Sequence, residues 1–152
     1  MATGDHTRTP PLLFLDFDGV LHPMSGHTTA GFVRAPALAE ALEPFDCDVV
    51  VSSSWRFGYT PAQIRDRLPR TLGARMVDVT GNALFGAHAR YREIQAWLRA
   101  CRPAPGVAWR ALDDSTWEFP ARCPELIACD PNTGVTTREL DALVAWLNRL
   151  RG

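Results

Sequence analysis

The sequence predicts an α/β fold in which helices cover both faces of a parallel sheet, a doubly wound arrangement of three layers. Three observations favour it. Short apolar or β-branched runs alternate with segments of helical periodicity along the chain. The run Asp48-Val-Val-Val-Ser52 shows no polar alternation, which is typical of a strand buried on both faces. Two other apolar runs lead directly into pairs of acids, which indicates Rossmann-like strands with polar side chains at their ends.

Five strands are predicted, each bounded by turn signals or polar residues. Pro10 and Pro11 precede the first strand, and a turn from Asp130 to Gly134, nucleated by the aspartate, follows the last. Two of the strands end in polar clusters, the serines 52–54 and the acids 113–114. The predicted ranges are 12–17, 48–52, 75–79, 107–112 and 126–129.

Four helices are predicted between or after these strands. Thr60 and Thr136 each have Gln or Glu three residues on, the spacing of a capping box, and Pro61 suits a first helical position. The range 91–101 carries apolar residues at i, i+3, i+4 and i+7. The ranges are 36–43, 61–68, 91–101 and a last helix after Thr136 whose expected buried stripe is Leu140, Leu143, Val144 and Leu147.

Length and composition predict one domain over residues 12–152 behind a flexible arm, residues 1–11. The chain has 152 residues, is 46% hydrophobic and shows no break in composition. Its formal net charge of -1 excludes an overall positive charge that would attract the protein to nucleic acid or to a membrane surface. No signal peptide or apolar run of about 20 residues is evident, so a cytoplasmic protein without a membrane partner is expected. The four irregularly spaced cysteines are expected to be buried free thiols.

The stretch from Leu12 to Leu21 is the candidate active site. Residues i and i+2 of a strand share a face, so Asp16 and Asp18 point the same way while Phe17 turns to the opposite side. Gly19 permits a sharp turn beside them. Two acids at the end of a buried strand repel each other unless a cation, a proton or a substrate offsets their charge. We therefore expect a ligand at this end of the sheet.

Four features of the chain between Leu12 and Ser115 resemble the four motifs of the haloacid dehalogenase (HAD) superfamily. They are Asp-Phe-Asp-Gly-Val after an apolar strand, a strand ending in Ser, a basic residue opening a later helix, and a strand ending in Asp-Asp. A narrower resemblance is to the small, uncapped, phosphatase-like HAD domain of RNA-repair ("Swiss Army Knife") proteins. It rests on Ser-Ser-Trp, on Glu-Ile-x-x-Trp-Leu in a helix, and on a late Asp-Pro-x-Thr-Gly.

The resemblance implies a phosphatase that acts through an aspartyl-phosphate. Asp16 is then the nucleophile, and Asp18 is the general acid and base. The superfamily's phosphatases keep this second acid and its dehalogenases lack it, so Asp18 favours phosphoryl chemistry. Mg²⁺ is the implied cofactor, bound by the Asp16 carboxylate, the Asp18 backbone carbonyl and one acid of the next pair. Asp114 is preferred as the ligand, with Asp113 supporting it.

Further site residues follow from the second motif. One hydroxyl of the serine cluster, with nearby backbone N–H groups, is expected to hold the phosphoryl group. Ser53 and Ser52 stay alternatives, because the end of a strand is not fixed to one residue by sequence. Gly19 and Arg56 complete the predicted phosphate site, although Arg56 has solvation as an equal alternative. Trp55 is expected in the core rather than under a substrate.

The third motif normally supplies a cation that offsets the nucleophile and the phosphate. Arg90 is the first candidate, followed by Arg92 and His88. Arginine in place of the commoner lysine keeps the charge and adds a fork of donors. His22 and His27 are expected to be solvated loop histidines, with a place at the site entrance as the alternative.

No cap domain is evident, which predicts an open site. Residues 21–35 are too few to fold alone, and residues 55–89 form a crossover of the core. An open site suits phosphate on a large partner such as an RNA or DNA terminus or a phosphoprotein. The first hypothesis is therefore a Mg²⁺-dependent phosphomonoesterase, and polynucleotide ends are its suggested substrate. The alternatives are a phosphatase of small metabolites or nucleotides, and a phospho-accepting or phosphate-binding module. The oligomeric state stays open.

Overall fold

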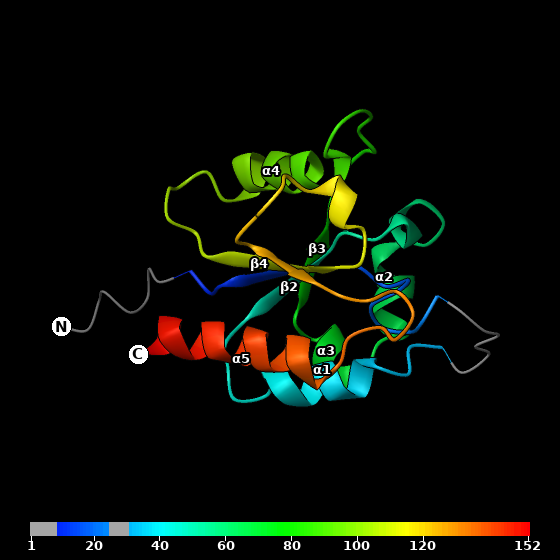
Figure 1. Ribbon diagram of the computed structural model, residues 1–152, viewed down its shortest axis with the longest axis vertical. Coiled ribbons are helices and arrows are strands. Elements are labelled where there is room, and N and C mark those ends of the chain that lie inside the picture. Colours follow the sequence, from blue (N-terminus) through cyan, green and yellow to red (C-terminus); the bar gives the residue numbers. More distant parts are fainter. Residues whose placement is uncertain (1–8, 25–30) are drawn as a thin grey trace.

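The first strand, β1 (Leu12–Leu15), consists of four fully buried apolar residues and lies in the middle of a five-stranded parallel sheet. The computed structural model describes residues 9–24 and 31–152. The strand order is β3-β2-β1-β4-β5 (Figure 1). This order confirms the predicted doubly wound sheet. The other strands are β2 (Asp48–Val51), β3 (Met76–Val79), β4 (Trp109–Asp113) and β5 (Leu126–Ala128).

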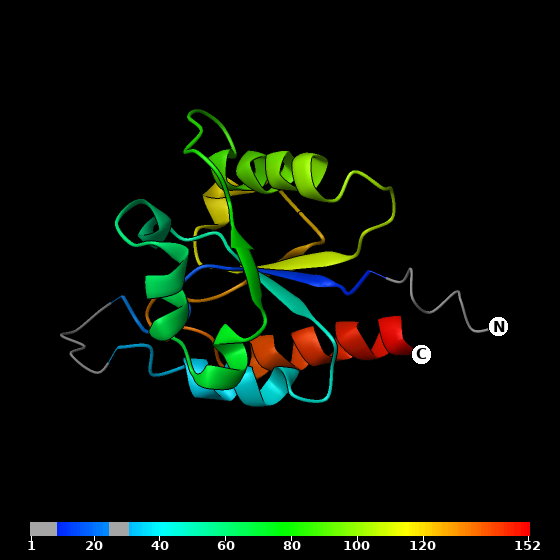
Figure 2. The ribbon, with the colours of Figure 1, turned by 180° about the vertical axis from the view of Figure 1, so that it is seen from behind.

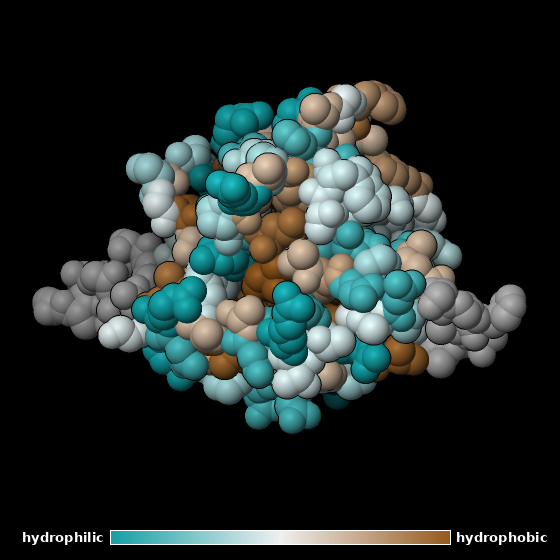
Figure 3. Space-filling model, in the orientation of Figure 1, coloured by the Kyte–Doolittle hydropathy of each residue, from teal (hydrophilic) through white to brown (hydrophobic). Residues whose placement is uncertain are grey.

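Helices cover both faces of the sheet and give it three layers. One face packs against α4 (Ala89–Cys101), and Figures 1 and 2 show α1 (Ala35–Leu42), α3 (Arg70–Gly73) and α5 (Thr137–Arg151) on the other. The alternation along β1 explains this division: Leu13 and Leu15 belong to the core under α1 and α5, whereas Leu12 and Phe14 pack under α4. Apolar side chains also show between α4 and α5 on the side of β5 (Figure 3).

Several predicted boundaries are corrected by the structure. The predicted helix 61–68 ends early as α2 (Pro61–Asp66), and α3 follows it separately. Two short 3₁₀ helices, η2 (Ser54–Phe57) and η3 (Thr116–Glu118), follow β2 and β4 and were not predicted. Both capping boxes are confirmed, at Thr60 and at Thr136. None of the helices among the described residues is long and apolar enough to cross a membrane.

Buried positions also differ from two of the predictions. In α5, Leu143 and Leu147 are buried as expected, but Trp146 joins them while Leu140 and Val144 are only half-buried. Of the four cysteines, Cys47 and Cys129 are buried, Cys123 is half-buried and Cys101 is exposed. The thiols are therefore free as expected, but not all buried.

The register of the strands places polar residues side by side at the carboxyl edge of the sheet. Leu15 is paired with Val51 of β2 and with Leu112 of β4. The residues that follow these three are Asp16, Ser52 and Asp113, in neighbouring positions. The described residues between β1 and α1 form turns, and those between β2 and β3 form only η2, α2 and α3. The carboxyl edge is therefore not covered by a cap domain from these described segments.

Candidate active site

Three carboxylates meet where β1 and β4 end. Asp16, Asp113 and Asp114 each offer one oxygen, and these oxygens lie within 4.8 Å of one another. Asp16 and Asp113 are buried, and Asp114 is half-buried. Because β1 and β4 are neighbours in the sheet, residues that are far apart in the sequence meet at one edge. The predicted convergence of the first and fourth motifs is what the structure shows.

Two of the three acids, Asp16 and Asp113, are in an environment that disfavours their negative charge. Burial raises the pKa of Asp16 well above its usual value, and the nearby charge of Asp113 adds to this effect. Burial likewise raises the pKa of Asp113 to about 6, although Arg90 opposes the shift. Hard carboxylate oxygens at this spacing are the donors that Mg²⁺ prefers, so the residues fit the implied cation.

Arg90 supplies positive charge to this cluster from the first turn of α4. Its Nη1 lies 2.7 Å from Asp113 Oδ2 and 3.5 Å from Asp16 Oδ1. The other candidates for this role lie elsewhere. Arg92 donates to the backbone carbonyls of Ala87 and Phe85, and His88 is the N-cap of α4 in a left-handed conformation, φ 54°. Of the three candidates, Arg90 is the one in contact with the acids.

Asp113, the last residue of β4, and Asp114, which follows it, have different surroundings. Asp113 has both oxygens engaged, since Oδ2 accepts from Arg90 and Oδ1 accepts from the Ser115 N–H at 2.9 Å. The carboxylate of Asp114 packs directly on Gly19, where a Cβ atom would lie 2.2 Å from Oδ2. A larger residue at this position would displace the Asp114 carboxylate, and the φ of +78° at Gly19 also favours glycine. This geometry supports Asp114 as the ligand and Asp113 as its support.

The Asp18 carboxylate does not join the cluster of three acids. It is 40% exposed, and its Oδ1 lies 2.7 Å from His22 Nε2. The Trp55 Nε1–H points between the two Asp18 oxygens, 3.3 Å from each. His22 is 16% exposed and hydrogen-bonded, so the expectation of a solvated loop histidine is wrong for this residue. His27 lies outside the described residues.

Trp55 packs against the core, as expected, and has a polar contact that was not expected. Its ring lies between Phe32 and Tyr59, with ring centroids 5.0 and 4.9 Å away. Phe17 meets it edge-on at 5.9 Å. The indole N–H is thereby directed at Asp18. Sequence alone could not show this contact, because the partners are 37 residues apart.

The two candidate serines have different roles in the structure. Ser53 Oγ accepts a hydrogen bond from the Trp55 N–H at 3.1 Å and caps η2. Ser52 Oγ is buried and has no hydrogen-bond partner among the described residues. A buried hydroxyl without a partner costs about 1–3 kcal/mol, so such a group is suited to meet a bound ligand. The geometry therefore favours Ser52 over Ser53 for the phosphate.

Arg56 forms part of the frame around the site. Its side chain is 3% exposed and donates to Glu93 Oε1, to the Gly81 carbonyl and to the Ser53 carbonyl, each at 2.9 Å. The solvated alternative is therefore wrong, and three of its nitrogens already have protein acceptors. Glu93 also accepts from the Leu84 N–H at 3.0 Å. The role of Glu93 was missed, although the Glu-Ile pair in the resemblance singled it out.

Gly19 differs from its predicted role as well. Its N–H donates to the His22 carbonyl at 3.0 Å and closes the turn after β1. This donor is therefore already used inside the protein, which disfavours a phosphate contact through the Gly19 N–H. What the structure shows instead is the close approach of Gly19 to Asp114 described above.

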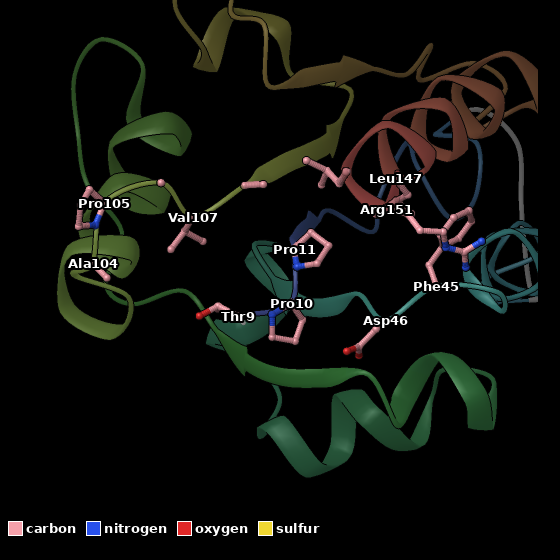
Figure 4. A pocket seen from close by; sticks show the side chains of 13 residues that line it. Thr9, Pro10, Pro11, Phe45, Asp46, Ala104, Pro105, Val107, Leu147 and Arg151 are labelled. Atoms are coloured by element: carbon pink, nitrogen blue, oxygen red, sulfur yellow. The ribbon is translucent and has the colours of Figure 1, made fainter. Parts of the chain in front are cut away.

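A cavity of about 670 Å³ lies at the opposite end of the sheet. Residues before β1 and β4 line it, together with residues from the end of α5 (Figure 4). They include Pro10, Pro11, Val107, Leu147 and Arg151. Among its described lining residues Asp46 is the one acid, whereas the cluster of three acids lies at the carboxyl edge of the sheet. The chemistry is therefore expected at that edge and not in this cavity.

Two comparisons with known proteins bear on this site. No curated protein matches the chain significantly. A family model described as "HAD domain in Swiss Army Knife RNA repair proteins" matches residues 12–140. The match covers all five strands and all the acids of the site. The chain belongs to this family of HAD domains.

Proposed function

We propose that the protein is a Mg²⁺-dependent phosphomonoesterase that forms an aspartyl-phosphate on Asp16. The observation that carries the proposal is the buried cluster of Asp16, Asp113 and Asp114 with Arg90 beside it. The family supports hydrolase chemistry of the phosphatase type. Asp18, two residues after the nucleophile, is exposed enough to meet a substrate and a water molecule.

The donors that would hold the cation are the carboxylates of Asp16 and Asp114 and the backbone carbonyl of Asp18. When bound, Mg²⁺ offsets the negative charge of the phosphoryl group and of the acids around it. Asp113 keeps Arg90 in place, and Arg90 contributes a fixed positive charge next to the nucleophile. Ser52 offers the unpartnered hydroxyl for a phosphate oxygen.

The reaction proceeds in two displacements. A carboxylate oxygen of Asp16 attacks phosphorus, the bond to the ester oxygen breaks, and Asp18 gives that oxygen a proton. Water then attacks the aspartyl-phosphate, and Asp18 takes up the proton that the water loses. Inorganic phosphate leaves, and both carboxyl groups return to their starting state.

The exposed aromatic residues support polynucleotide ends as substrates. Phe57, Phe85 and Trp117 are 59%, 87% and 71% exposed. They follow the carboxyl ends of β2, β3 and β4, and Figures 1 and 2 show these loops gathered at one end of the sheet. Unpaired bases stack on exposed aromatic rings, with about 1–3 kcal/mol for each base. Bases next to a terminal phosphate would meet these rings.

The mechanism is tested with Asp16→Asn and Asp18→Asn on an aryl phosphate in Mg²⁺. Both variants are expected to lose most of the wild-type turnover, Asp18→Asn because its amide cannot take up the proton of the attacking water in the second displacement. Asp16→Asn should also form no acid-stable phosphoprotein in a quenched reaction. Turnover undiminished by either change would refute the mechanism. A wild-type protein without turnover in Mg²⁺ would favour a phosphate-binding module.

The substrate is tested with Phe85→Ala and Trp117→Ala on 3′- and 5′-phosphorylated oligonucleotides. Both variants should raise KM for oligonucleotides and leave KM for an aryl phosphate unchanged. Val77→Ala is the matched control, because Val77 is 45% exposed but lies in the first half of β3, before its carboxyl end. Preferred turnover of a free nucleotide or small metabolite, unaffected by these variants, would favour the small-molecule alternative. Affinity for oligonucleotides should also fall steeply with salt.

A further inference from the structure

We propose that His22 is a positioning residue that holds the proton-carrying carboxylate of Asp18 in its working orientation. The inference rests on the proposed function, in which Asp18 exchanges a proton with the leaving group and with water. It starts from the contact of 2.7 Å between His22 Nε2 and Asp18 Oδ1. A histidine in this loop has no role in the four motifs of the resemblance.

The carboxylate of Asp18 needs an external support. Its side chain is 40% exposed and stands apart from the acid cluster, so nothing in that cluster fixes its rotamer. Within the part of the chain that the structure describes, His22 and Trp55 are the residues whose side chains hydrogen-bond to it. His22 binds Oδ1 at 2.7 Å, and the Trp55 N–H is shared between both oxygens at 3.3 Å. Oδ1 is therefore held, and Oδ2 is the oxygen with capacity left for a substrate or water.

His22 is itself firmly placed. Its Nδ1 lies 2.8 Å from the Pro23 carbonyl, which can only accept, so Nδ1 carries a hydrogen and Nε2 is the atom directed at Asp18. The ring stacks on Phe32, with centroids 6.0 Å apart and planes at 21°. The imidazole thus has one edge fixed by the backbone and one face fixed by an aromatic ring.

The backbone of this loop is supported from a distant part of the chain. The Val135 N–H donates to the Val20 carbonyl at 2.7 Å, and the Met24 N–H donates to the Pro131 carbonyl at 2.7 Å. A Cβ atom at Gly134 would lie 2.8 Å from the Val20 oxygen and 3.4 Å from the His22 carbonyl carbon. The turn 130–134 therefore packs closely on the segment that carries His22.

Loss of the His22 contact should impair the steps in which Asp18 transfers a proton. In the first displacement one O–H bond of the Asp18 carboxyl group breaks while the leaving ester oxygen gains the proton, so this carboxyl group must be oriented toward that atom. A misplacement of about 1 Å costs about 10²-fold in rate. The cost is large for a poor leaving group, which needs the proton as the ester bond breaks. It is small for a good leaving group, which departs without it.

The test compares kcat/KM on two phosphate esters, para-nitrophenyl phosphate as the good leaving group and a simple alkyl phosphate as the poor one. His22→Phe keeps an apolar ring against Phe32 and removes the contact with Asp18. It should lose about 10²-fold on the alkyl ester and only a few-fold on the aryl ester. Asp18→Asn, which removes the proton itself, should show the same pattern more strongly.

Two further variants separate positioning from folding. His22→Gln retains an amide that can reach Asp18 and should recover most of the alkyl ester activity. His22→Asn provides the same comparison as His22→Phe if the phenylalanine lowers the melting temperature. Arg138→Gln, a change on the exposed side of α5, is the control and should leave both substrates unaffected.

Each result decides the matter. The positioning role would be overturned if the His22 variants lost equally on both esters or lost nothing on the alkyl ester. The proposed function would then still stand, provided that Asp18→Asn showed the expected dependence on the leaving group. If Asp18→Asn itself showed no dependence on the leaving group, the acid role of Asp18 would be refuted and this inference with it.

Discussion

Arg90 and Asp113 form an ion pair that is almost closed off from solvent, with Nη1 2.7 Å from Oδ2 and side chains 13% and 1% exposed. Removing one partner of such a pair leaves the other as an unpaired buried charge. Arg90→Met is therefore expected to lower the free energy of unfolding by about 3–5 kcal/mol, measured in urea. The double variant Arg90→Met with Asp113→Asn should lose less than the sum of the two single changes. Arg92→Met, which removes only contacts to backbone carbonyls, is the control and should cost about 1 kcal/mol.

The pH dependence of stability should reveal the buried acids in the metal-free protein. Burial raises the pKa of Asp113 to about 6 and that of Asp16 well above its usual value, so the folded state binds more protons than the unfolded chain above pH of about 4. This contribution to stability is complete below that pH and is lost as the pH rises through about 6. In EDTA, wild type should therefore lose stability relative to Asp113→Asn as the pH rises, so that the unfolding free energy of wild type minus that of the variant decreases. A difference that grows over this range would contradict the assignment.

Magnesium should stabilise the folded protein through Asp114. A cation at 100 times its Kd raises the free energy of unfolding by about 2.7 kcal/mol, because it binds only the folded state. Asp114→Asn should abolish most of the rise in melting temperature that Mg²⁺ produces. Asp141→Asn removes an exposed acid of α5 and should keep the full rise. An undiminished effect of Mg²⁺ on Asp114→Asn would exclude Asp114 as the ligand.

Replacing Ser52 should affect the binding of phosphate esters, whereas replacing Ser53 should affect the stability of the fold. Ser53→Ala removes the cap of η2 and should cost about 1 kcal/mol of stability. Ser52→Ala removes a hydroxyl that lacks a partner, so its stability should be unchanged or slightly higher, whereas KM for phosphate esters should rise. Urea unfolding and steady-state kinetics on both variants check this. The reverse pattern would make Ser53 the phosphate ligand.

Gly19 and Gly106 offer a matched pair of glycines in the left-handed region. Their φ values are +78° and +86°, so an alanine at either position should cost about 1–2 kcal/mol. At Gly106 nothing lies within 4 Å of the added Cβ, but at Gly19 the Cβ would lie 2.2 Å from Asp114 Oδ2. Gly19→Ala should therefore lose phosphatase activity as well, and Gly106→Ala should retain it. Equal activity in the two variants would show that the Asp114 position is not essential.

Much of the fold could be predicted because its signals are local. The strand β2 is a β-branched run, and the caps at Thr60 and Thr136 each lie within four residues of their partners. The convergence of Asp16 with Asp113 and Asp114 also followed, since ends of neighbouring parallel strands meet. The short elements α3, η2 and η3 were missed, because a single turn carries too little periodicity to be recognised.

The site residues that were misassigned depend on partners distant in sequence. Arg56 was expected at the phosphate or in solvent, but Glu93 of α4 holds it below the surface. His22 looked like a loop residue, and its burial depends on Phe32 and on a turn more than a hundred residues later. The choice between Ser52 and Ser53 required the contact of Ser53 with Trp55. In each case the residue type drew attention to the position, but the sequence did not indicate which residue it contacts.

The central position of β1 also affects how the chain acquires its structure during synthesis. The strand β1 emerges before β2 and can pair with it as soon as β2 has been made, but the other edge of β1 stays open until β4 has been made. Parallel pairing over such a length of chain is slow, since a long loop must close before the contact forms. Asp113 and Asp114 arrive with that same late strand. A partly made chain therefore exposes an unpaired edge of β1 and has no complete acid cluster, so the cluster of Asp16, Asp113 and Asp114 is completed only when β4 pairs with β1.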